Sequence, residues 1–203
     1  TRTLGDVDEP TAPYGLLDVH GDGSAIVEVK KAIEPALAGA IREAARRHKV
    51  SPATLFHAGW ALVVAACSGR DDVVFGTVLS GRLQGTAGAG QTLGMFINTL
   101  PLRLNLAGAN VAQLVAQAES ALKELLGYEQ ASLALAQRCS AVAAGMPLFT
   151  AMLNYRHSEE AVGELDGFDT GIRVISATER TNYPFNVSID DFGDAFAIDA
   201  QIH

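Results

Sequence analysis

The most constraining feature of this sequence is the stretch 71–104, which reads as strand, loop, strand. Residues 73–79 are a run of β-branched and apolar side chains, the pattern of a buried strand. Ser80 and Gly81 end this run, a glycine-rich segment follows, and a second strand is expected from about Gly94 onward. A loop of about twelve residues without structure of its own is at the long end of the usual range, and such loops are often functional. A mobile hairpin connection is the alternative.

The rest of the chain alternates helical and extended patterns, with capping residues that predict where the helices begin and end. Helices are expected over about 34–49, 51–68, 110–126 and 129–143, and strands over about 24–30, 148–155, 171–179, 185–189 and 196–200. The second helix is apolar around most of its circumference, which predicts a buried helix. Helices alternate with strands early in the chain, and strands pair with each other late in the chain. This order predicts an α/β fold, built as an α+β sandwich with a mixed β-sheet covered by helices. Residues 1–23 are expected to be an irregular linker, and 24–203 one domain.

Composition excludes several classes of function. A net charge of −8 argues against nucleic acid as a partner, because phosphate binding needs a basic surface. The longest apolar run, 58–67, is too short to span a bilayer, and no signal peptide is expected. Cys67 and Cys139 form no metal motif and are expected to be small core residues of a cytoplasmic protein, because the reducing cytoplasm disfavours disulfides.

Known catalytic motifs are missing from the sequence. It contains no GxSxG elbow, Walker A loop or HExxH pair, and the glycine-rich segment 85–94 lacks the lysine and helix start of a phosphate-binding loop. His57 lies in an apolar helix, where a histidine with satisfied hydrogen bonds in the core is the expected role.

Three segments carry a resemblance to a known family. LGMFINTLPLR at 93–103 resembles the IGxFVNTxxxR motif of condensation domains of nonribosomal peptide synthetases, through Gly94, Phe96, Asn98, Thr99 and Arg103. GMPLFTAMLNYR at 145–156 resembles their NPLF-type motif through Pro147, Leu148 and Phe149, and YEQASLALAQRCS at 128–140 loosely resembles the segment before it. The resemblance implies a chloramphenicol-acetyltransferase-like lobe with a floor-loop region at about 76–99.

The family's catalytic signature, HHxxxDG, is absent. The histidines are His20, His48, His57, His157 and His203, and none of them is next to another. In the family that signature lies upstream of every segment matched here. The chain is therefore expected to be the C-terminal lobe of a condensation domain, with no catalytic residue of its own and no metal site.

The resemblance implies amide-bond formation between donor and acceptor thioesters held on carrier proteins. The expected partners are the N-terminal lobe, the two carrier proteins and neighbouring synthetase domains. No cofactor is expected on this chain itself, since the substrates ride on the phosphopantetheine arms of the carriers. Epimerisation, cyclisation and ester-forming sibling domains remain alternatives, as does a non-catalytic recruitment platform. A basic cluster near the end of the first helix has two interpretations. Its cations either stabilise the helix C-terminus or form a docking patch for an acidic carrier protein; its members are Arg42, Arg46, Arg47 and Lys49.

The resemblance implies that this chain forms part of the wall and floor of the substrate channel. Asn98 is expected either to donate a hydrogen bond to a carbonyl in the channel or to bond backbone across the strand. Ser80, Arg82 and Thr99 are further channel candidates, each with an ordinary turn or surface role as the alternative. Arg103 is expected to be structural, with a salt bridge to a carboxylate of the other lobe. Asn182 and Tyr183, before a proline, are weaker candidates.

Overall fold

The computed structural model describes residues 3–18, 26–80, 96–157 and 181–203. In chain order their elements are η1 (Pro13–Gly15), β1 (Val27–Ala32), α1 (Pro35–His48), α2 (Pro52–Ser68), β2 (Asp72–Leu79), β3 (Asn98–Asn105), α3 (Val111–Leu126), α4 (Leu133–Arg138), β4 (Ala151–His157), β5 (Phe185–Asp191) and β6 (Phe196–Ile202).

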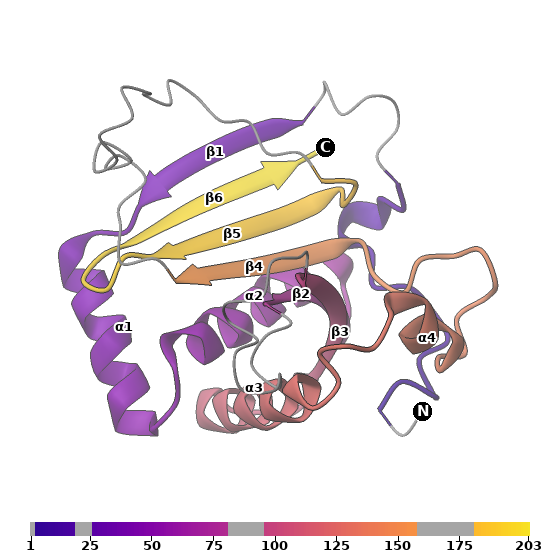
Figure 1. Ribbon diagram of the computed structural model, residues 1–203, viewed down its shortest axis with the longest axis horizontal. Helices are drawn as coiled ribbons and strands as arrows, with labels where there is room; N and C mark the ends of the chain where they lie inside the picture. Colours follow the sequence, from indigo (N-terminus) through magenta and orange to yellow (C-terminus); the bar gives the residue numbers. More distant parts are fainter. Residues whose placement is uncertain (1–2, 19–25, 81–95, 158–180) are drawn as a thin grey trace.

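Within these described ranges, six strands form one sheet in the order β1-β6-β5-β4-β2-β3. β2, β4 and β5 run parallel to one another, whereas β3, β6 and β1 pair antiparallel with their neighbours. Figure 1 shows α2 and α3 on one side of this sheet and α4 near β3. The predicted fold class, a mixed sheet covered by helices, is confirmed.

The helix boundaries follow the capping signals in the sequence. Ser51 accepts a hydrogen bond from the Thr54 N–H at 3.2 Å, and α2 ends at Gly69 with φ 67°. Asn110 forms a capping box with Gln113 at the start of α3. These caps confirm the predicted starts of both helices because each hydroxyl or carboxamide satisfies an otherwise unpaired N–H.

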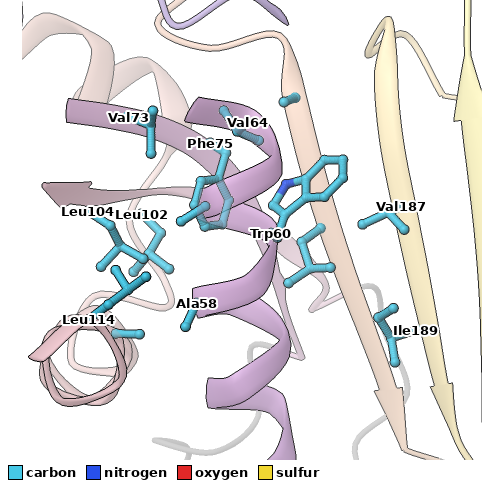
Figure 2. Close-up of a cluster of buried hydrophobic side chains, with 14 of the residues drawn as sticks. Ala58, Trp60, Val64, Val73, Phe75, Leu102, Leu104, Leu114, Val187 and Ile189 are labelled. Atoms are coloured by element: carbon cyan, nitrogen blue, oxygen red, sulfur yellow. The ribbon is translucent and has the colours of Figure 1, made fainter. Parts of the chain in front are cut away.

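One buried cluster joins the helices to the sheet. Figure 2 shows Trp60 on the side of α2 that faces β4 and β5, with Val187 and Ile189 opposite, whereas Leu114 of α3 lies on the other side of α2, near Leu102 and Leu104. Along β5, Val187 and Ile189 point into this cluster, so Asn186 and Ser188 point to the opposite face. On β5 this alternation gives an apolar face under the helices and a polar face on the other side.

Several local predictions are wrong. The helix expected over 129–143 is limited to α4, because Ser132 caps it only at Leu133. The strand expected to start at 148 starts at Ala151. α2 is not buried all round, since Leu62 and Val63 are 51% and 43% exposed. The strand predicted over 171–179 lies outside the described residues.

Residues 3–18 pack closely against the sheet. Leu4 and Val7 are buried in a second cluster with Val74, Leu148 and Phe149. The Val74 N–H donates to the Thr11 hydroxyl at 2.9 Å, and Thr11 forms a β-bridge with Phe149. The division of the chain at residue 23 stays a prediction.

Two predictions, on the cysteines and on membrane-spanning segments, can be compared with the structure. Cys67 and Cys139 are free thiols, and both are half-buried, so the prediction that they lie in the core is wrong. Among the described residues, no single helix is long and apolar enough to cross a bilayer; α1 and α2 pass that test only as a pair, bent by 104°.

Candidate functional site

The strand–loop–strand element places Asn98 and Thr99 at the end of β2 and β3 that meets the loop, and Arg103 near the other end. β2 and β3 pair antiparallel from Asp72↔Asn105 to Leu79↔Asn98. Ser80 is exposed directly after β2, and Phe96 is half-buried just before β3. Arg82 and Gly94, the remaining members of the predicted floor loop, lie outside the described residues.

Asn98 ties the start of β3 to the turn after α3. Its amide nitrogen donates to the carbonyls of Glu129 at 2.9 Å and Ala131 at 2.6 Å. Both N–H groups of the carboxamide are thus used within the chain. Of the two roles expected for Asn98, a bond to backbone is the one observed. The backbone belongs to the turn after α3 and not to the neighbouring strand.

Thr99, Gly76 and Phe149 bring the two family-like motifs together. The Thr99 hydroxyl approaches the Met152 sulfur at 3.9 Å. The Phe149 ring packs directly over Gly76, where an added Cβ would lie 2.5 Å from a ring carbon and 3.0 Å from the Thr99 methyl. On its other side Phe149 stacks on Tyr183, with ring centroids 5.6 Å apart. Pro147 is half-buried nearby. These contacts explain why a glycine occupies the middle of β2.

Arg103 is bound by carboxylates of this chain. Its guanidinium donates to Asp72 at 2.6 to 3.2 Å, to Asp6 at 2.6 and 3.0 Å, and to the Thr3 carbonyl at 2.7 Å. These bonds use the whole donor set of the guanidinium and raise its pKa further. The expected salt bridge to a carboxylate on another lobe is therefore wrong.

His57 is a neutral core histidine, as expected. Its Nδ1 lies 2.7 Å from the Ala53 carbonyl, and its Nε2 lies 2.7 Å from the Thr77 hydroxyl. Nδ1 therefore carries the hydrogen, and Nε2 accepts from Thr77. Burial lowers its pKa to about 4. A ring held by two partners in the core is not placed to exchange protons with a substrate.

A carboxylate between the two last predicted strands, which the sequence did not single out, lies at the centre of a second polar network. Asp191 is 4% exposed and accepts from Arg42 of α1 at 2.5 Å, from the Tyr155 hydroxyl and from the Gly193 N–H. Burial alone would raise its pKa, but these donors outweigh burial and hold the pKa at about 2. Arg42 also stacks on Phe196 at 4.1 Å. Arg42 is therefore not free for a docking patch, whereas Arg46, Arg47 and Lys49 are exposed.

Two hollows lie beside these residues. One, of about 530 Å³, is bounded by β3, α3 and α4 and is mostly apolar, with Tyr128 and Cys139 in its wall. The other, of about 470 Å³, lies where β4 and β5 begin and includes Pro147, Phe149 and Tyr183. Within the described ranges, no group of three or more His, Cys, Asp or Glu side chains could hold a metal ion.

Residues 23–202 of this chain match the model of the condensation domain. The chain belongs to the condensation-domain family. Among curated relatives it is 48% identical to malpibaldin synthetase of Mortierella alpina over 202 residues, which is 100% of this chain and 4% of the synthetase. It is 46% identical to malpinin synthetase of the same organism over 98% of this chain and 2% of that protein. The chain therefore spans a small part of these synthetases.

Solved condensation domains share the fold. The condensation domain from monacolin K polyketide synthase gives a TM-score of 0.71 at 21% identity, over 98% of this chain and 48% of that chain. The first condensation domain of the calcium-dependent antibiotic synthetase gives 0.67 at 23% identity, over 91% of this chain and 41% of that chain. The chain spans less than half of each of these two solved chains.

Four histidines lie in the described residues of this condensation-domain segment. His57 is held in the core, His48 is exposed, His157 Nδ1 lies 3.4 Å from Asp191 Oδ2, and His203 is half-buried. The sequence did not single out Asp191, because an Asp-rich connection between two strands is ordinary, or Thr11, because an irregular segment gives no periodic signal.

Proposed function

We propose that this chain is the C-terminal half of a peptide-synthetase condensation domain, which forms an amide bond between donor and acceptor thioesters held on carrier proteins. The observation that carries the proposal is coverage. The chain aligns over 98% and 91% of its own length but only 48% and 41% of two solved condensation-domain chains. The HHxxxDG signature is absent from its sequence. The missing half would be the lobe with that signature.

The chemistry demands little beyond positioning. An α-amine has a pKa near 8, so about a tenth is neutral at pH 7, and this costs about 1.4 kcal/mol. The thioester is already activated, and well-oriented reactants reach effective molarities of about 10⁵ to 10⁸ M. The oxyanion that forms also needs a hydrogen-bond donor. A rigid wall built from β2, β3 and β4 suits such a reaction, and the upstream lobe would supply the base.

Partners follow from the same chemistry. The upstream lobe would complete the site, the donor and acceptor carrier proteins would deliver substrates on phosphopantetheine arms, and neighbouring synthetase domains would flank the chain. In this proposal Ser80 and Thr99, which lie at or beside the end of β2, line the channel. Asn98 and Arg103 hold the channel wall in place through their backbone and carboxylate contacts.

Product formation from two loaded carrier proteins tests the proposal. We expect no amide product by intact mass with this chain alone, and product when its natural upstream segment is added. Product from this chain alone would contradict the proposal that the upstream lobe supplies the base, and the histidines of this chain would then be the candidates for that role. Absence of product in both cases, with the two pieces shown to associate, would favour a recruitment platform. Unloaded carriers serve as the control.

A further inference from the structure

β1 forms an open edge of the sheet, and Figure 1 shows it as the outermost strand on its side. Among the described strands it pairs with β6 alone, and all six of its residues are exposed. Val27 and Val29 are 58% and 59% exposed, so two apolar side chains of this strand face solvent. An edge strand with unpaired N–H and C=O groups is a template on which another strand can add.

β3, the strand at the other edge, carries the devices that prevent such pairing. It contains Pro101, which has no N–H to offer, and the Asn105 N–H donates to the Gln117 side chain of α3 at 2.8 Å. Both α3 and α4 pack against β3. β1, with the sequence VEVKKA, has no proline and is exposed along its whole length. Of the two edges, β1 is therefore the one that can accept a strand.

The ladder between β1 and β6 shows which backbone groups of β1 are directed outward. The Ile33 N–H donates to the Phe196 carbonyl at 2.8 Å, which is on the side of β6. Because successive residues of a strand direct their N–H and C=O groups to alternate sides, Glu28 and Lys30 direct theirs away from β6. The outward-directed residues are thus one anion and one cation, two positions apart.

We propose that β1 pairs antiparallel with β1 of a second copy of this chain, about a two-fold axis at Val29. In this register Glu28 of each copy lies opposite Lys30 of the other, so these residues exchange backbone hydrogen bonds and their charges attract. Val29 meets its own counterpart, and the aliphatic stem of Lys31 can cover the exposed Val27 of the other copy. The same six residues serve both copies, as a two-fold interface requires.

Charge selects this register over its neighbours. With the axis at Glu28, each Glu28 would lie opposite the other, and with the axis at Lys30 the two Lys30 side chains would do so. Like charges directly opposite one another destabilise a strand pair. The axis at Val29 matches every outward-directed charge with its opposite.

Sedimentation velocity of the 203-residue chain tests the proposal. A net charge of −8 makes two copies repel, so the measurement belongs at about 150 mM salt, where charges are screened beyond about 8 Å. A single edge of six residues forms a small interface, and small interfaces bind weakly. We expect a monomer–dimer equilibrium between about 10 and 500 µM chain.

Charge reversal at the edge distinguishes this pairing from other self-association. Glu28→Lys and Lys30→Glu should each weaken the dimer about tenfold or more, because each turns both cross-strand pairs into like charges. An equimolar mixture of the two variants should dimerise again, since each then supplies the charge that the other needs. Glu124→Lys makes the same charge change as Glu28→Lys on an exposed residue of α3, beside the opposite edge, and should leave the dimer unchanged.

Recovery on mixing also controls for folding. Lys30 lies 3.4 Å from Asp199 of β6, so urea unfolding of each variant checks that the sheet is intact. Three results would overturn the proposal: a monomer at every concentration up to about 500 µM, a dimer that neither reversal weakens, or folded variants that dissociate and do not recover when mixed. The inference is independent of the proposed function, and its readout needs no amide formation.

Discussion

At the scale of single residues, Gly76 makes the sharpest demand. A Cβ there would meet the Phe149 ring at 2.5 Å, inside a strand with buried neighbours on both sides. Gly76→Ala should therefore lower the free energy of unfolding in urea by about 1 to 3 kcal/mol through overpacking. Gly59→Ala is the matched control: nothing lies within 4 Å of its added Cβ, and alanine in α2 should stabilise by about 0.5 to 1 kcal/mol. Equal effects of the two substitutions on the free energy of unfolding would disprove the close packing. So would a double variant, Gly76→Ala with Phe149→Leu, in which the smaller side chain at 149 recovers none of the stability that Gly76→Ala loses.

The site residues show how far a sequence can lead at this scale. The motif pattern picked out Asn98, Arg103 and Phe149, and all three make specific contacts in the fold. Their partners could not be predicted, because they come from distant segments. Arg103 meets Asp6 across 97 positions of sequence, and no local periodicity encodes that pairing.

At the scale of elements, Asp191 joins the β5–β6 hairpin to α1 and β4. Its pKa of about 2 lies below the usual value near 3.9, so the folded state gains stability from the ionised form. That gain is complete above about pH 5 and is lost progressively as pH falls toward 1, and it amounts to about 2 to 3 kcal/mol. We expect Asp191→Asn to destabilise the chain at pH 7 and to approach the stability of the natural chain at pH 2, in urea unfolding followed by Trp60 fluorescence.

Asp194→Asn is the control for this prediction, since Asp194 is an exposed residue of the same hairpin. It should change the unfolding free energy by less than about 0.5 kcal/mol at every pH. A stability difference between Asp191→Asn and the natural chain that stays constant from pH 7 to pH 2 would show that the carboxylate's charge is not what matters.

Elements with strong local signals were predictable, and those defined by tertiary contacts were not. The caps at Ser51 and Asn110 act within one turn, so the sequence alone located α2 and α3. The helix expected from 129 begins only at Leu133, because the turn before it is held by Asn98 from β3. β4 begins later than its apolar run, since residues 148–150 pair with Thr11 instead.

At the scale of the whole molecule, the open question is where the folded unit begins. A linker would tolerate substitution, whereas Leu4 is 8% exposed and packs with Val74 and Phe149. Leu4→Ala should lower the free energy of unfolding by about 2 to 3 kcal/mol through loss of buried surface and the cavity left behind. Leu17→Ala, in the same segment but 43% exposed, should change it by less than about 0.5 kcal/mol. If urea unfolding gives two equally small effects, residues 3–18 are a linker. If only Leu4→Ala destabilises, the segment is part of the fold, as the Arg103 contacts to Thr3 and Asp6 also indicate.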